Sequence, residues 1–293
     1  MIFRRFIFRE WFLGLIILGL AVSVSPKAFA APSVDENKAL LEQIVGLVRV
    51  VNTLEEQLLL QSSQSASSIA VDKRMMGVQA ETEYLVLGGA LLRLDKVAEP
   101  RKIDQQIFDF LKAVWGEEKV VEKINQFRVF YDTEMNLDAY VETREVLMKK
   151  TIVGVNREWF DLDNSANKQA MARLLVHEYA HILFSERTDL VKKFVAQFWT
   201  IADKNREQEF ALLSNEIVFS KLDKSFDSSR FVSSYAALSA DEDLAETFVD
   251  FVFKARPSGS TIKDQKVRSF YLDRELVKER ARLLTNLERV GVR

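Results

Sequence analysis

The stretch "LLVHEYAHILF", residues 174–184, contains both histidines of this 293-residue chain. His177 and His181 are four positions apart, and Glu178 directly follows the first of them. On an α-helix, positions i and i+4 lie on one face, about one turn apart, so both imidazoles can reach one metal ion. Glu178 is rotated by about 100° from His177 and can overhang that ion. The spacing predicts a zinc site in which Glu178 takes a proton from an activated water.

A plainer interpretation of this stretch is a pair of core histidines on an apolar helix. We favour the metal site because the chain has only two histidines, placed at ligand spacing around a glutamate. A catalytic zinc site needs three protein ligands and an open position for water. The chain has no cysteine and no further histidine, so the third ligand must be a carboxylate.

The overall composition is that of an ordered, helix-rich protein. The chain is 48% apolar and 29% charged, with 10 glycines and 4 prolines. Its formal net charge of -2 offers no basic field, so we expect no nucleic-acid partner. The absence of cysteine excludes disulfide scaffolds, zinc fingers and thiol catalysis.

The first thirty residues are typical of a secretory signal peptide. The basic stretch "MIFRRFIFRE" precedes the apolar run "WFLGLIILGLAVSV", and Ala28-Phe29-Ala30 provides a small-x-small cleavage site. We therefore predict a secreted or periplasmic protein, cleaved after Ala30. The alternative is an uncleaved membrane anchor, for which the apolar run is short.

Residues 31–100 are predicted to form an N-terminal helical region. Apolar residues keep a helical three-four spacing from Leu40 to Leu58. This helix either packs within its own chain or forms a short coiled coil, which would give a homodimer through residues 38–60. The polar stretch "QSSQSASS", residues 61–68, is predicted to be a linker.

A second helical stretch is predicted after this linker. It would continue to about Lys96, interrupted at Gly88-Gly89.

Residues 101–293 are predicted to form one α+β domain. Segments rich in Val, Ile, Phe and Tyr predict strands at 127–133 and 151–160, and the second strand could bind an extended substrate as a sheet edge. Helices are expected around "IDQQIFDFLKAVWG", from the caps Asp163, Asn164 or Ser165 through the two histidines, over 240–253, and over 268–290. A small sheet would thus precede the histidine helix and a helical C-terminal half.

The third ligand is sought in the acidic stretch "ADEDLAETFVDFVF", residues 240–253. Glu242 and Glu246 lie one turn apart near the start of this expected helix. One of them could bind zinc while the other hydrogen-bonds a histidine ligand and orients its ring. The plainer interpretation is a solvated acidic helix start, which the helix dipole favours.

The histidine motif and the downstream glutamate together resemble zinc metallopeptidases of the gluzincin type within the zincins. More narrowly, "FVSSYAALSADEDLAETF", residues 231–248, resembles the catalytic segment of anthrax-toxin lethal-factor-like peptidases. In that family a tyrosine lies seven residues before the ligand glutamate, which is followed by a two-residue spacer and then "AE". Tyr235, Glu242 and Ala245-Glu246 occupy those places.

The resemblance covers residues 127–253 and implies a zincin-like fold with one catalytic Zn²⁺. It implies Glu242 as the third zinc ligand, with Glu246 bonded to a histidine ligand. Tyr235 would be the hydroxyl that stabilises the oxyanion. The plainer interpretation of Tyr235 is an ordinary packed aromatic. Residues 31–100 match no family that we can name.

These observations predict a zinc-dependent endopeptidase with Glu178 as general base and a peptide or protein as substrate. The alternative is a secreted zinc-binding protein without catalysis, or a helical assembly protein. A structural zinc site usually has four protein ligands, so Asp243 in the fourth position would favour that alternative.

Overall fold

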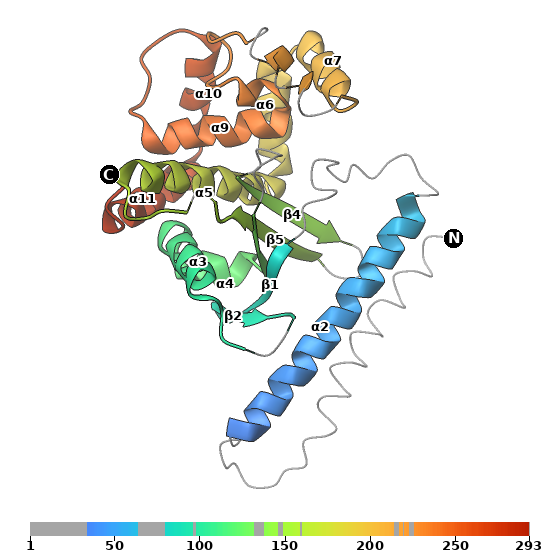
Figure 1. Cartoon of the computed structure of the whole chain (residues 1–293). Helices are drawn as coiled ribbons and strands as arrows, with labels where there is room; N and C mark the ends of the chain where they lie inside the picture. Colours follow the sequence, from blue (N-terminus) through green and yellow to red (C-terminus); the bar gives the residue numbers. More distant parts are fainter. Residues whose placement is uncertain are drawn as a thin grey trace. The chain divides into compact units, whose positions relative to one another are not determined.

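A computed structural model describes residues 34–63, 80–95, 98–131, 138–145, 149–158, 160–213, 217–218, 220–222 and 226–292 (Figure 1). The predicted signal peptide and residues 64–68 of the predicted linker lie outside them. The chain divides into two compact units, of which one contains the helix α2 and the other contains the sheet and the remaining helices. None of the described helices is long and apolar enough to cross a membrane.

The first unit contains α2 (Val34–Ser63), which confirms the predicted N-terminal helix. The helix continues through Ser63, so the first three residues of the predicted linker are helical. Leucines at the three-four spacing are between 42% and 48% exposed, namely Leu40, Leu47, Leu54 and Leu58. The homodimer through residues 38–60 stays a prediction.

The second unit is built on a five-stranded sheet in the order β2-β1-β3-β5-β4. β1 is antiparallel to both β2 and β3, whereas β3 and β5 run parallel. Together with the surrounding helices this confirms the predicted α+β fold. The strands are β1 (Ala80–Leu87), β2 (Ala90–Arg93), β3 (Gln126–Phe130), β4 (Ala139–Glu145) and β5 (Lys149–Asn156).

The prediction of a helix up to about Lys96 is wrong, because β1 and β2 form a hairpin there. Gly88 and Gly89 have φ angles of 57° and 81°, and two consecutive positive φ angles are the geometry of the tight turn that best fits twisted strands. The two glycines therefore reverse the chain. Because β1 also pairs with β3, the hairpin belongs to the sheet and not to the predicted N-terminal helical region.

The strand predicted at 151–160 is present as β5, but it is not a sheet edge. β5 lies between β3 and β4, so its backbone groups are engaged on both sides. The edge strand next to β5 is β4, which the sequence did not predict because its charged residues conceal the alternation. The ring of Tyr140 on β4 lies where a Cβ on Gly154 of β5 would be, and it also stacks on Phe130.

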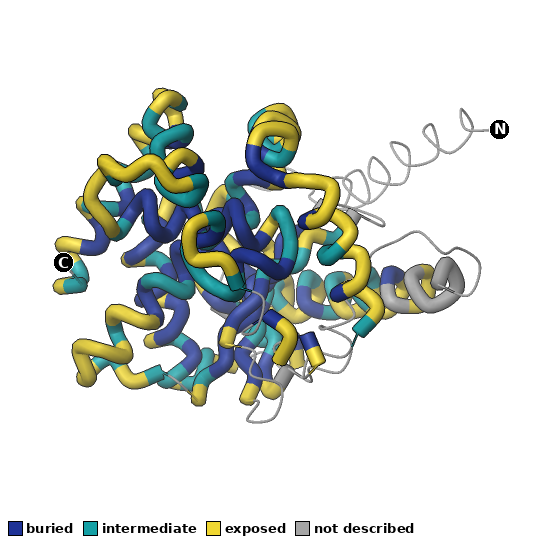
Figure 2. Tube along the Cα trace, turned by 90° about the horizontal axis from the view of Figure 1, so that it is seen from above, coloured by how far each residue is buried: buried dark blue, intermediate teal, exposed yellow. Residues whose placement is uncertain are grey.

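The helix α5 (Ser165–Ser185) lies between two groups of elements in the second unit (Figure 1). The sheet, α3 (Lys102–Trp115) and α4 (Glu117–Lys123) lie on one side of it. On the other side are α6 (Thr188–Phe198), α7 (Ile201–Phe210), α9 (Ala240–Phe253) and α10 (Ile262–Phe270). Figure 2 shows buried positions gathered along the inner elements. Most side chains of α5 are buried from Met171 onward, which explains why this part of the helix is largely apolar.

The last predicted helix, over 268–290, is in fact two helices. α10 ends at Phe270, and α11 (Arg274–Arg289) begins after Asp273. The Asp273 carboxylate accepts hydrogen bonds from the amides of Glu275 and Leu276, which caps α11. The helix predicted over 240–253 is confirmed as α9, with the same bounds.

Candidate metal centre

α5 presents both histidines toward one point. Its N-cap is Asn164, one of the three expected caps, whose side chain accepts from the amides of Ala166 and Asn167. One turn of helix separates His177 from His181, and their ring centroids are 4.8 Å apart. The two Nε2 atoms approach to 3.1 Å. This proximity follows directly from the four-residue spacing on a helix.

Glu242 on α9 completes a group of three donor atoms. Its Oε2 lies 3.0 Å from Nε2 of His177 and 3.4 Å from Nε2 of His181. The Ser239 side chain caps α9 by accepting from the Glu242 amide, which holds the backbone of this residue in place. Among the described residues, this trio forms a group that could hold a metal ion.

The donor set fits zinc. Tetrahedral ligand atoms at about 2.0–2.1 Å from a zinc ion lie about 3.3 Å from one another. The three donor atoms here are 3.0, 3.1 and 3.4 Å apart. Two imidazole nitrogens and one carboxylate oxygen are also ligands that zinc accepts. With lone pairs facing a common point, such a trio is stable when a cation or protons lie between them.

Glu246, one turn after Glu242 on α9, orients the first histidine. Its Oε1 lies 2.8 Å from Nδ1 of His177, so a proton on Nδ1 leaves Nε2 free to bind a metal. The Ser233 hydroxyl hydrogen-bonds the Glu246 carboxylate and accepts from the Ala236 amide. The tautomer of His177 is thus set by a residue from a different helix.

The electrostatics of the ion-free site reflect this crowding of charge. Burial alone lowers the pKa of His177, but hydrogen bonds to Glu242 and Glu246 outweigh it and raise that pKa to about 10. Burial raises the pKa of Glu242, but its hydrogen bonds to the two histidines outweigh burial and hold the pKa well below its usual range. The site therefore favours positive charge beside a carboxylate, as a cation site must.

Glu178 is buried between α5 and the edge strand. Burial raises its pKa, and the positive charge of His177 and His181 opposes this effect only in part. The backbone amide of Val141 on β4 hydrogen-bonds the same carboxylate. This contact, which the sequence did not suggest, places the edge strand of the sheet beside the proposed general base.

Tyr235 lies beside the ligand trio in a short helical turn, η2 (Tyr235–Ala237). Its hydroxyl donates to Oε1 of Glu242 at 3.3 Å, and its ring centroid lies 5.8 Å from that of His177. The structure thus brings Tyr235 together with His177, His181, Glu242 and Glu246, while their roles stay predictions.

Asp243 does not take a fourth ligand position. Its side chain is fully buried, and its Oδ2 accepts from Nζ of Lys266 at 2.6 Å and from Nε1 of Trp199 at 2.8 Å. Oδ1 accepts from the Thr247 hydroxyl at 3.3 Å. Asp243 therefore gives no support to a zinc site closed by four protein ligands.

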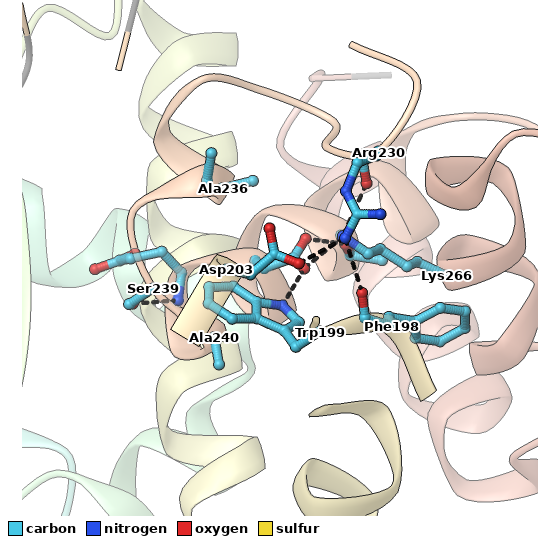
Figure 3. A network of polar contacts seen from close by, with 12 residues as sticks. Phe198, Trp199, Asp203, Arg230, Ala236, Ser239, Ala240 and Lys266 are labelled. Atoms are coloured by element: carbon cyan, nitrogen blue, oxygen red, sulfur yellow. Dashed lines mark hydrogen bonds and ion pairs between the residues drawn. The ribbon is translucent and has the colours of Figure 1, made fainter. Parts of the chain in front are cut away.

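A polar network next to Glu242 was missed by sequence reasoning (Figure 3). It joins Trp199, Asp203, Arg230 and Lys266 to Asp243. No local pattern signals it, because its members lie on separate elements and its charged members resemble ordinary surface charges. The only available signal was the acidic start of α9, which could have suggested a role for Asp243 because it directly follows the candidate ligand.

Comparison with known proteins adds one distant likeness. No protein-family model matches the chain, and no curated protein does. Among solved structures, a "putative zinc-binding metallo-peptidase" from Bacteroides caccae ATCC 43185 aligns with a TM-score of 0.34 and 19% identity, over 65% of this chain and 77% of that one. A TM-score this low does not establish a shared fold, so the proposal below depends on the site's own geometry.

Proposed function

We propose that the protein is a zinc-dependent endopeptidase that acts outside the cytoplasm. The observation that carries this proposal is the trio of His177, His181 and Glu242, with donor atoms at tetrahedral spacing and Glu178 beside it. The location follows from the predicted signal peptide, residues 1–30. The substrate class is a peptide or protein.

A zinc ion held by His177, His181 and Glu242 would acidify a water molecule and polarise the scissile carbonyl. Glu178 takes the proton of the attacking water and returns it to the leaving amine. In the ion-free site, burial raises the pKa of this carboxyl group, which makes the carboxylate a better proton acceptor than an exposed glutamate.

The Tyr235 hydroxyl can donate a hydrogen bond to the oxygen that becomes negatively charged during attack on the carbonyl. This hydroxyl lies at the edge of the ligand trio, where it can exchange Glu242 for the oxygen of the tetrahedral intermediate. Such a donor acts on the charge that develops during attack, so its contribution falls on kcat.

The edge strand β4 is the element that an extended substrate can join. None of the described strands pairs with its outer side, and Val141 on it contacts Glu178. A peptide that adds to this edge by backbone hydrogen bonds would pass beside the general base. Binding of this kind sets the orientation of the chain more than the choice of sequence.

The test is Glu178→Gln, compared with the matched change Glu186→Gln at the exposed end of the same helix. We expect wild type to bind one zinc per chain and to cleave members of a peptide library. Glu178→Gln should keep the zinc and lose hydrolysis, while Glu186→Gln should keep both. Equal cleavage by Glu178→Gln and wild type would show that another group is the base, and a wild type that binds no zinc would refute the proposal.

A further inference from the structure

A buried ion pair lies directly behind the candidate ligand Glu242. Nζ of Lys266 on α10 and Oδ2 of Asp243 on α9 are 2.6 Å apart, and both side chains are 0% exposed. Trp199 donates to the same oxygen. Burying such a pair removes both charged groups from water, and this desolvation cost can exceed the gain from their attraction. The pair is therefore weak evidence of stabilisation, and we ask which other contacts its two residues make.

Lys266 also holds the start of the segment that carries Tyr235. Its ammonium donates to the carbonyl oxygen of Arg230 at 2.8 Å and lies 4.1 Å from the ring centroid of Phe231. The same ammonium thus contacts the helix of Glu242 and the chain leading to Tyr235. Figure 3 shows Lys266 and Arg230 meeting at this point.

The other end of that segment is held by a second cation. Nε of Arg206 on α7 donates to the carbonyl oxygen of Ala237 at 3.2 Å. Arg206 also pairs with Asp203 at 3.2 Å, and Asp203 pairs with Arg230 at 2.6 Å. Asp203 and Arg230 therefore link Arg206 to Lys266. The carbonyl groups that these two cations contact, those of Arg230 and Ala237, lie on either side of Tyr235 in the sequence.

Between these two anchors, the chain has little regular structure of its own. η2 is only three residues long, so its internal hydrogen bonds cannot fix the direction of the Tyr235 side chain. The Tyr235 hydroxyl nevertheless lies 3.3 Å from Glu242. Contacts with other elements must therefore hold the segment, and those at Arg230 and Ala237 act together with the Ser233–Glu246 hydrogen bond.

We propose that Lys266 and Arg206 are positioning residues that hold Tyr235 against the Glu242 site. The inference rests on the proposed peptidase function, because it assigns Tyr235 to the developing oxyanion. Each cation acts through a backbone carbonyl of the Tyr235 segment. Misplacing a catalytic donor by about 1 Å can cost about 100-fold in rate.

The main test is a double-mutant cycle between Arg206→Met and Tyr235→Phe. Arg206 is partly exposed, and its replacement leaves the Asp243–Lys266 pair intact. We expect Arg206→Met to lower kcat by about 10- to 100-fold, with KM and zinc content nearly unchanged. In the Tyr235→Phe background the same change should have no further effect on kcat. Equal effects in both backgrounds would overturn the proposal.

Arg187→Met is the matched control. Arg187 has a similar exposure of 26% and an ion pair of 2.6 Å with Asp273, a residue outside the Tyr235 segment. It reports the general cost of removing a half-buried, paired arginine. We expect it to leave kcat unchanged, and a loss as large as that of Arg206→Met would count against positioning.

Hydrogen exchange separates this proposal from the peptidase function itself. Without added zinc, Arg206→Met should speed amide exchange in residues 231–239 but not in α5, whereas Arg187→Met should spare both. If Arg206→Met leaves amide exchange in residues 231–239 unchanged, Arg206 does not position Tyr235, whatever the peptidase activity of the variant. Faster exchange in a protein whose wild type cleaves no peptide would refute the peptidase function and leave the anchoring contacts supported.

Lys266→Met tests the other anchor, although it leaves Asp243 buried and unpaired. The double variant Asp243→Asn, Lys266→Met removes both charges and keeps a side chain that can accept from Trp199. We expect the folded double variant to show the same loss of kcat and the same local exchange as Arg206→Met. Wild-type kcat in the folded double variant would exclude Lys266 from positioning.

Discussion

Nδ1 of His177 lies 2.8 Å from Oε1 of Glu246, and this contact decides which ring nitrogen faces Glu242. Glu246 belongs to the same helix as Glu242, so α9 contributes both the carboxylate at the ligand position and the carboxylate that orients the facing histidine. The two glutamates are one turn apart and point at opposite edges of one imidazole ring. The proposed zinc site would therefore depend on how α9 packs against α5.

Replacing Glu246 should therefore weaken zinc binding without abolishing it. We expect Glu246→Leu to lower zinc affinity by about 10- to 100-fold, because the His177 ring loses its orienting partner. Glu246→Gln keeps an acceptor oxygen and should lose less. Competition with a chromogenic chelator measures both, and Asp241→Asn on the exposed side of α9 is the control. Equal affinity of Glu246→Leu and wild type would remove Glu246 from the site.

Removing the Tyr235 hydroxyl should affect turnover rather than metal binding. We expect Tyr235→Phe to lower kcat by about 100- to 1,000-fold, the usual cost of losing one oxyanion donor. KM and zinc content should change little, since the hydroxyl contacts the ligand carboxylate only at its outer oxygen. Steady-state kinetics beside Tyr131→Phe, an exposed tyrosine, provide the check. Unaltered kcat would show that Tyr235 is merely packed.

Gly154 should not tolerate a side chain. A Cβ at this position would overlap the buried ring of Tyr140, which stacks on Phe130. We expect Gly154→Ala to lower the free energy of unfolding by about 1–3 kcal/mol, as overpacking does. Denaturant titration against Gly46→Ala, a helical glycine with open space around it, distinguishes this from a generic effect of glycine replacement.

Tyr84 should make the protein less stable in alkali. Burial and the hydrogen bond to Asp104 raise the pKa of Tyr84 to about 12. Between the ordinary pKa of about 10 and this raised value, the folded state binds more protons than the unfolded state, so stability falls as pH rises. We expect a loss of about 2 kcal/mol over this window, absent in Tyr84→Phe. Urea titrations at pH 9 and 11.5 measure the difference, and parallel losses in both proteins would contradict it.

Local spacing accounts for the parts of the site that could be predicted. His177, Glu178 and His181 lie on one helix, so helical geometry alone relates them, and the Asn164 cap and the bounds of α9 were likewise readable from nearby residues. The hairpin β1–β2 was mistaken for helix because its alternation has meaning only once β3 pairs with it. The edge position of β4 depends on the order of the strands in the sheet, and this order cannot be predicted from any single segment of sequence.

The residues of α9 alone left open which glutamate faces the metal, and the resemblance to known peptidases pointed to Glu242. In the structure, Oε2 of Glu242 meets the two Nε2 atoms and Oε1 of Glu246 meets Nδ1. That choice depends on how α9 packs against α5, across 65 residues of chain. The same packing buries Asp243 with Lys266 instead of leaving it in solvent. Helical spacing within α5 was enough to recognise the motif from the sequence. The packing of α9 against α5 determines which partner each carboxylate contacts.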